Sequence, residues 1–235
     1  MLYDPVSWVT IVGGATLLGA AARARLHVSV RLALIVFAGF LLRLDAAWQW
    51  SLHIWDESFH ALVASNLRDA PFMPLLYARP AVPYDRLDWM SNHVWPHKPP
   101  GALWLMALSL KIFGTNELAV RAPSVLLSTA GVALTFFIAA SLVSTRVALL
   151  AAGVHAVNGF LIALAAGRRV ADHVDTALVF FVQLGCVGTD FARIRPETAQ
   201  AAKFNAIAAA RQWRTGAAPE CRRERPFQGR RTGHA

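Results

Sequence analysis

Long apolar runs cover most of this chain and limit what it can fold into. The strongest is Arg121–Val143, and others are Ser7–Ala22, Val28–Leu44, Val147–Ala166 and Thr176–Val187. A helix needs about 20 mostly apolar residues to cross a bilayer. Only 16% of the residues are charged, whereas about 25% are charged in a typical soluble domain. We therefore expect an all-α, polytopic membrane helix bundle.

The net charge of +9 is unevenly distributed along the chain. Residues 1–188 carry 13 Lys and Arg against 10 Asp and Glu, whereas residues 189–235 carry 10 against 4. The composition predicts an N-terminal hydrophobic segment (1–27), a membrane domain (28–188) and a basic, Ala/Arg-rich tail (189–235) that is disordered or weakly helical. Because the tail holds +6 of the net charge of +9, the basic composition does not indicate a nucleic-acid partner.

The first two apolar runs leave some choices open. Ser7–Ala22 has no preceding Lys or Arg, which favours a membrane span or an interfacial helix over a signal peptide or a misplaced start codon. In Val28–Leu44, Arg31 and Arg43 stand near opposite ends of the run. Long arginine side chains at such positions can reach the two membrane interfaces, and we expect this of both.

Positive charges predict the orientation of the spans. Arginines cluster just before the second run, and Arg146 separates Val143 from Val147. The positive-inside rule places both regions in the cytoplasm. Only one crossing can then lie between residues 45–100 and Arg146, and Arg121–Val143 is the better candidate.

The apolar stretch Gly101–Phe113 is therefore predicted to be an interfacial helix in the first external loop. The same counting places residues 45–100 and 167–175 outside and the tail inside. Polar groups that are far apart in the sequence are thereby expected to meet at one external membrane surface.

Two adjacent carboxylates, Asp56 and Glu57, follow the second apolar run. A carboxylate that is partly desolvated at a membrane interface is a stronger base. The alternative is that both residues simply begin a helix, where acidic side chains interact favourably with the helix dipole.

A second polar motif consists of His97 and Lys98 followed by Pro99 and Pro100. Proline is well tolerated in a first helical turn, so a helix is predicted to start here. A lysine beside the free N–H groups of a helix start would make a phosphate site. The alternative is a proline-defined turn with solvated His and Lys side chains.

The third polar motif runs from Arg168 to Asp175. Asp172 and Asp175, together with Asp56 or Glu57, could hold a divalent cation, for which carboxylates favour Mg, Ca or Mn and histidine shifts the preference towards Zn or Mn. The alternative is a set of salt bridges between the acidic and basic side chains of this segment.

The order of these motifs resembles that of the GT-C superfamily of membrane glycosyltransferases over about residues 30–187. The protein O-mannosyltransferases and the bacterial lipid A aminoarabinose transferases are the most similar types. The matching residues are Asp56, Glu57, His97, Lys98, Pro99, Pro100, Phe113, Gly114, Asn116, Glu117, Arg121, Gly167, Arg168 and Asp172.

The resemblance implies a sugar transfer from a polyprenyl-phosphate donor to a protein, lipid or glycan acceptor. Asp56 would be the general base for the acceptor hydroxyl, and Glu57 would support Asp56 or bind the sugar. Lys98 would neutralise the leaving phosphate.

The remaining matched residues would complete the site. His97, Arg121 and Arg168 would position or bind the donor phosphate, and Asp172 would be a second acidic residue. A divalent cation (Mg, Mn or Zn) at Asp56 and Asp172 is a possible cofactor, although Lys and Arg could neutralise the phosphate without one.

The resemblance also implies a multi-pass protein of the plasma (inner) membrane with its active-site loops on the external or periplasmic face. Members of the superfamily have more spans than this chain, so we expect a truncated or frameshifted copy whose activity is open. Two alternatives are a small noncatalytic membrane protein whose tail binds membrane lipids, and a divalent-ion binding membrane protein.

Overall fold

The computed structural model describes residues 5–23, 25–48, 51–53, 56–81, 83–87, 92–168 and 174–189. The regular secondary structure of these residues is helical, apart from one isolated antiparallel bridge between Leu75 and Val94. The all-α prediction is thus confirmed for the part of the chain that is described. Asp172 and residues 190–235 lie outside it, so the predictions for Asp172 and for the tail stay predictions.

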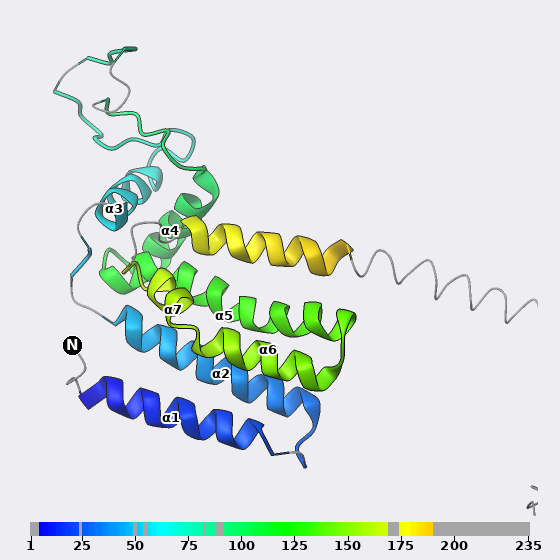
Figure 1. The fold of residues 1–235 in the computed structure, drawn as a ribbon. Helices are drawn as coiled ribbons and strands as arrows, with labels where there is room; N and C mark the ends of the chain where they lie inside the picture. Colours follow the sequence, from blue (N-terminus) through cyan, green and yellow to red (C-terminus); the bar gives the residue numbers. More distant parts are fainter. Residues whose placement is uncertain are drawn as a thin grey trace, which may run out of the picture. The chain divides into compact units, whose positions relative to one another are not determined.

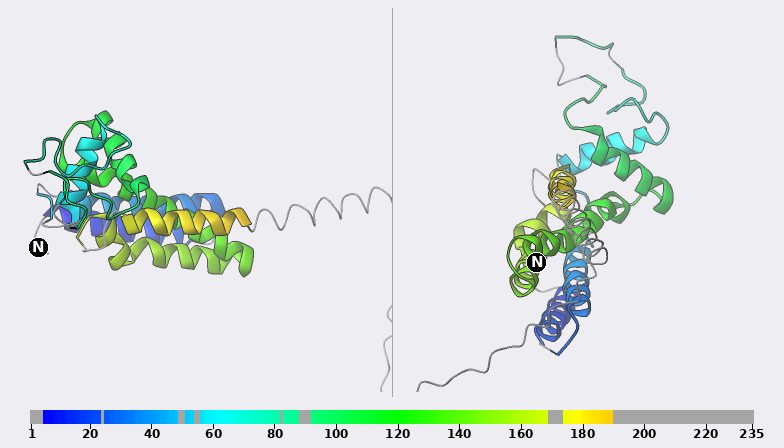
Figure 2. Two further views of the ribbon diagram at one scale, coloured as in Figure 1. Left: turned by 90° about the horizontal axis from the view of Figure 1, so that it is seen from above. Right: turned by 90° about the vertical axis from the view of Figure 1, so that its right-hand side faces the viewer.

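The described helices form a bundle with two shorter helices at one end. They are α1 (Pro5–Ala21), α2 (Val28–Ala47), α3 (Asp56–Leu67), α4 (Pro100–Phe113), α5 (Glu117–Leu142), α6 (Thr145–Val157), α7 (Gly159–Ala165) and a last helix, Val174–Thr189. The long helices lie side by side, and α3 and α4 gather at the end where α2 finishes and α5 begins (Figures 1 and 2). This end of the bundle brings the polar motifs together.

Length and composition allow α5 to cross a membrane. The bent pair α6 and α7 would be a second span if the two helices cross together. Helices α1, α4 and Val174–Thr189 are apolar but shorter, and α2 carries three charged residues within its 20 positions. The polytopic arrangement and the place of α4 at the membrane surface therefore stay predictions.

The apolar run Val147–Ala166, which was predicted to span the membrane, is divided between the two helices α6 and α7. The chain bends by 54° between α6 and α7. Asn158 ends α6 and caps α7, because its side-chain oxygen accepts a hydrogen bond from the N–H of Leu161 at 3.1 Å. Asparagine is among the most favoured residues at a helix N-cap, so the sequence itself specifies the break.

Helix α5 begins four residues before the predicted start at Arg121. Asn116 caps it by accepting a hydrogen bond from the N–H of Ala119 at 2.8 Å. The same side chain donates to the carbonyl oxygen of Phe113 at 3.0 Å, at the end of α4. Arg121 therefore lies in the second turn of α5 and faces the protein interior, where its side chain is fully buried.

Small residues allow α2 and α6 to approach closely. Ala148, Ala152 and Ala156 form a fully buried stripe along α6. A Cβ atom added to Gly39 on α2 would lie 3.3 Å from the Cβ of Ala156. Such small-residue contacts are typical of helix pairs in membranes, where close backbone approach replaces the hydrophobic effect.

Arg43 lies inside the bundle and does not reach an interface, so that prediction is wrong. Its side chain is fully buried between α2, α5 and α6. Nε donates to the Ser128 hydroxyl at 2.7 Å, and Nη1 and Nη2 donate to the carbonyl oxygens of Ala156 and His155 at 3.0 and 3.3 Å. The last carbonyls of a helix have no partner within the helix and carry partial negative charge. The end of α6 therefore compensates the cation.

Replacing Gly39 by Leu should destabilise the bundle, since the new side chain must displace α6 or the Arg43 guanidinium. Overpacking of this kind costs about 1–3 kcal/mol. Thermal unfolding of the purified chain in detergent, followed by circular dichroism, measures the effect. Gly153→Leu on α6 is the control, because a Cβ added there meets nothing within 4 Å. An equal change in both variants would contradict the close α2–α6 contact.

Candidate functional site

A buried ion pair joins α3 to α5 at the end of the bundle where the polar motifs lie. Arg121 Nε donates to Glu57 Oε1 at 2.6 Å, and Arg121 Nη2 donates to Glu57 Oε2 at 3.0 Å. Both side chains have no exposed surface. A bidentate pair of this geometry fixes the relative orientation of the two helices as well as their separation.

The same two side chains also tie down the connection between α2 and α3. Arg121 donates to the carbonyl oxygens of Ala47 and Ser51 at 2.9 and 2.8 Å. The backbone N–H of His53 donates to Glu57 Oε2 at 2.6 Å. Glu57 and Arg121 thus hold the backbone of the α2–α3 connection in place. This arrangement favours support of Asp56 over sugar binding as the role of Glu57.

Asp56 is the first residue of α3 and is half-buried. No hydrogen bond or ion pair to its carboxylate comes from the residues that the structure describes, in contrast to the adjacent Glu57. Its position in a first helical turn also fits the simpler interpretation, in which the helix dipole stabilises the charge. Asp56 keeps part of its surface exposed, whereas the Glu57 side chain has none.

His97 and Lys98 lie immediately before α4, as their prolines predict. Pro99 occupies the N-cap position and Pro100 is the first helical residue. Pro99 provides no side-chain cap, so the first N–H groups of α4 remain available to another acceptor. Lys98 is half-buried, and the described part of the chain gives it no carboxylate partner. This geometry is compatible with the expected phosphate site.

Trp95 connects His97 to α3, and sequence reasoning did not single it out. The Trp95 ring is buried, with its centre 5.1 Å from that of His97 and 5.3 Å from that of His60. His60 is fully buried and lies one helical turn after Asp56. The backbone N–H of Trp95 donates to the carbonyl oxygen of Pro74 at 2.8 Å, and this bond fixes the backbone of the segment. Trp95 lies two residues from both His93 and His97 in the sequence, but its contact with His60 on α3 has no local signal.

Arg168 reaches the same end of the bundle from α7. Gly167 has a φ of 69°, and the N–H of Arg168 donates back to the carbonyl oxygen of Ala163 at 2.9 Å. This is a Schellman ending, for which glycine is the favoured residue. Arg168 Nη2 then donates to the carbonyl oxygen of Ala46 at 2.9 Å.

Arg168 and Arg121, two of the matched arginines, influence each other electrostatically. Burial and the positive charge of Arg121 lower the pKa of Arg168, and Asp45 acts in the opposite direction. The Arg168 side chain remains exposed in part. Two arginines held close together favour an anion beside them, because it relieves their mutual repulsion.

The second matched glycine also has a local structural role. Gly114 has a φ of 82° and ends α4, and Asn116 then starts α5. Glu117 lies in the first turn of α5, where an acidic side chain is favoured. The motif from Phe113 to Arg121 is therefore the corner that places Arg121 opposite Glu57.

The described residues do not fit a metal site. They contain no group of three or more His, Cys, Asp and Glu side chains that could hold an ion. Asp172, the predicted partner of Asp56 in cation binding, lies outside them. We derive no reaction step through a cation.

The comparison with known protein families gives a match for one part of the chain. The model of the dolichyl-phosphate-mannose-protein mannosyltransferase family matches residues 97–198. This part of the chain is similar to the GT-C glycosyltransferases. The match begins at His97 and includes Lys98, Arg121, Arg168 and Asp172, whereas Asp56 and Glu57 precede it. No curated protein and no solved structure matches the chain.

Over residues 97–198, the family match supports the resemblance to the GT-C superfamily that was inferred from the motifs. The match also continues to residue 198, ten residues past the composition break at Gly188. The roles of the individual site residues are not tested by it and remain proposals.

Removing either partner of the Glu57–Arg121 pair should destabilise the fold. Glu57→Gln and Arg121→Gln are each expected to lower the free energy of unfolding by about 3–5 kcal/mol, because the remaining charge would be buried without compensation. Chemical unfolding of the detergent-solubilised chain measures this.

Arg146→Gln is the matched control, because Arg146 is exposed at the opposite end of α5 and α6. It should change the free energy of unfolding by no more than about 0.5 kcal/mol. Single variants that are as stable as this control would contradict a structural role for the pair.

Proposed function

We propose that the chain is part of a membrane glycosyltransferase that moves a sugar from a polyprenyl-phosphate donor to a protein, lipid or polysaccharide hydroxyl. The family match that starts at the His97-Lys98-Pro99-Pro100 motif carries this proposal. Asp56 begins α3, Lys98 lies just before α4, and Arg168 donates to the carbonyl oxygen of Ala46 at the end of α2, where α3 and α4 gather (Figure 1).

The proposed reaction is a single displacement with inversion at the anomeric carbon. The Asp56 carboxylate accepts the proton of the acceptor hydroxyl as its oxygen forms the new bond to the anomeric carbon. The bond between that carbon and the phosphate oxygen breaks, and polyprenyl phosphate leaves with one more negative charge. The half-buried ammonium of Lys98 stabilises this charge.

The surrounding side chains would hold these groups in place. Arg168 is exposed in part and is proposed to bind the donor phosphate together with the free N–H groups at the start of α4. Glu57 and Arg121 fix the start of α3 and so the position of Asp56, while Trp95 supports His97. Asp172 is proposed as a second acidic residue from the resemblance alone.

The membrane setting is proposed from the distribution of charge. Arg146 lies between α5 and α6 and belongs on the cytoplasmic side. The opposite end of α5, where the polar motifs gather, would then face the external or periplasmic side of the plasma (inner) membrane. Several spans are needed for this arrangement, with α5 as the best supported.

Transfer of a radiolabelled sugar tests the proposal. Membranes that contain the chain are incubated with polyprenyl-phosphate mannose or polyprenyl-phosphate aminoarabinose, and the label in protein, lipid and glycan fractions is counted. Asp56→Asn and Lys98→Met are each expected to lower the rate at least about 100-fold, because each removes a group that acts in the transition state.

Asp69→Asn and Lys111→Met are the matched controls, since both residues are exposed on or beside the same helices, α3 and α4. They should leave the rate unchanged. Full activity of Asp56→Asn would remove Asp56 from the base role. Absence of transfer by the unaltered chain with either donor would favour a noncatalytic membrane protein.

A further inference from the structure

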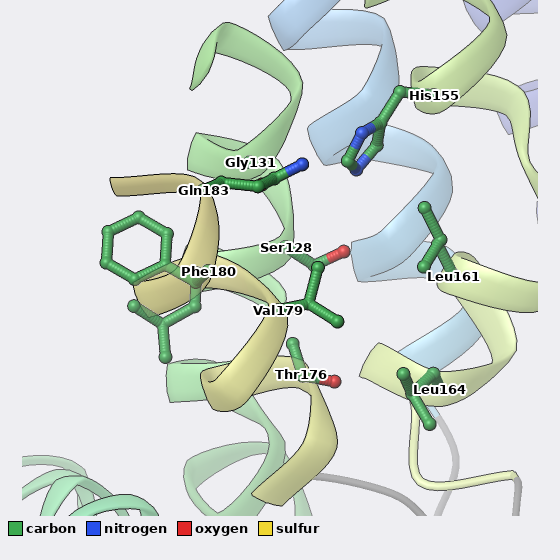
Figure 3. Close-up of a pocket in the computed structure, with 10 residues that line it drawn as sticks. Ser128, Gly131, His155, Leu161, Leu164, Thr176, Val179, Phe180 and Gln183 are labelled. Atoms are coloured by element: carbon green, nitrogen blue, oxygen red, sulfur yellow. The ribbon is translucent and has the colours of Figure 1, made fainter. Parts of the chain in front are cut away.

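The pocket inside the bundle, between α5, α6, α7 and the helix Val174–Thr189, is a poor place for a polar ligand. Apolar side chains form much of its lining, among them Leu161, Leu164, Val179 and Phe180 (Figure 3). Such a lining offers few groups that could replace the hydration of a polar or charged molecule. The surface of the bundle carries a stronger feature, at the end opposite the polar motifs.

Two helix turns, α1–α2 and α5–α6, lie together at this opposite end. Figure 1 shows both at the far end of the long helices from α3 and α4, and Figure 2 shows the same arrangement from above. Ala21 at the end of α1 and Ala148 near the start of α6 belong to one buried cluster. The two turns are therefore neighbours in the fold, although they are far apart in the sequence.

Arginine side chains gather on these turns without acidic partners. Arg23 and Arg25 lie in the α1–α2 turn and Arg146 is the second residue of α6, and all three are exposed. Residues 5–44 and 118–171 contain no Asp or Glu. No ion pair or side-chain hydrogen bond of the three arginines comes from the part of the chain that the structure describes. This end of the bundle thus presents positive charge that those residues leave uncompensated.

Local hydrogen bonds fix the turns that carry the arginines. Arg31 Nε donates to the carbonyl oxygen of Ala21 at 2.6 Å, and so satisfies one of the last carbonyls of α1. The His27 side chain caps the start of α2, and the Ser144 side chain caps the start of α6. The backbone is therefore ordered before any ligand binds, which lowers the entropy cost of binding.

The chemistry of arginine indicates what this surface binds. Its planar guanidinium matches the geometry of phosphate and binds it through two parallel hydrogen bonds. A basic side chain in the first turn of a helix is unfavourable for the helix itself, so helix stability does not account for Arg146. An anion beside the arginines would relieve their mutual repulsion.

Exposed apolar side chains border the arginines and distinguish between phosphate-containing ligands. They are Leu26, Val30, Leu142, Val143 and Val147. A soluble phosphate would leave these side chains in water. A phospholipid instead places its phosphate on the arginines and its acyl chains against the apolar side chains. The combination of the two kinds of side chain therefore favours a membrane lipid.

We propose that this end of the bundle, formed by Arg23, Arg25, Arg146 and the apolar side chains beside them, binds the headgroups of anionic phospholipids. The lipid phosphates supply the negative charge that the neighbouring segments lack. In the proposed membrane setting this surface is cytoplasmic, so the lipids hold α2 and α5 at the membrane face opposite the polar motifs. The proposal does not depend on sugar transfer.

Photocrosslinking with lipids tests the surface directly. The full chain is reconstituted into symmetric phosphatidylcholine vesicles that contain a photoactivatable phosphatidylglycerol or a photoactivatable phosphatidylcholine with the same acyl chains. After irradiation, mass spectrometry of the peptides locates the attached lipid. We expect phosphatidylglycerol to label residues 22–31 and 141–147 at least about 10-fold more than phosphatidylcholine does, because each basic side chain strengthens the binding of an anionic membrane lipid about fivefold.

A double variant and a matched control sharpen the test. Arg25→Gln combined with Arg146→Gln removes one arginine from each turn, and should lower the labelling by phosphatidylglycerol about 10-fold. Arg79→Gln combined with Arg86→Gln removes the same charge from exposed positions in the segment between α3 and α4, and should preserve the labelling. Circular dichroism of both variants in detergent verifies that they are folded.

The comparison of the two lipids on the unaltered chain needs no variant to fold. Equal labelling of the two turns by both lipids, or phosphatidylglycerol attached only to other parts of the chain, would overturn the proposal. Loss of the label in excess inorganic phosphate would assign the arginines to a soluble phosphate and would also overturn it. Unchanged labelling of the folded Arg25/Arg146 variant would do the same. None of these results requires transfer activity, so a failure of the proposed function is distinguishable from a failure here.

Discussion

The ion pair between Glu57 and Arg121 joins three helices at the point where the polar motifs meet. Arg121 contacts the end of α2 and the segment that follows it, and Glu57 contacts the start of α3. The Glu57 and Arg121 side chains are both fully buried, so each charge depends on the other and on these hydrogen bonds for compensation. The position of Asp56, the residue before Glu57, depends on this set.

The residues that start and end helices could be recognised in the sequence. Pro99 and Pro100 start α4 as expected, and the apolar run behind them is the helix that was predicted there. The break at Asn158 was missed, although an Asn-Gly pair inside an apolar run was a readable signal. The apolar pattern continues on both sides of this pair, so hydropathy alone does not reveal the break.

Long-range partners could not be predicted in this way. Arg43 and Ala156 are 113 positions apart, and nothing local to Arg43 distinguishes it from an arginine at a membrane interface. Similarly, Glu57 and Asp56 are adjacent and chemically equivalent in the sequence. Only the fold shows that one carboxylate is enclosed by Arg121 whereas the other stays partly exposed. The motif order identified the superfamily, but the assignment of roles within a motif needs the three-dimensional contacts.

The contact of Arg43 with the end of α6 has a consequence for biosynthesis. When α2 emerges from the ribosome, the carbonyl groups that compensate its arginine do not yet exist, because α6 is synthesised more than a hundred residues later. An uncompensated arginine within the bilayer is unfavourable, so α2 alone is a poor membrane segment. In the proposed membrane setting, stable insertion of α2 would await α5 and α6, and the segment from α2 to α6 would enter the membrane as one cooperative unit.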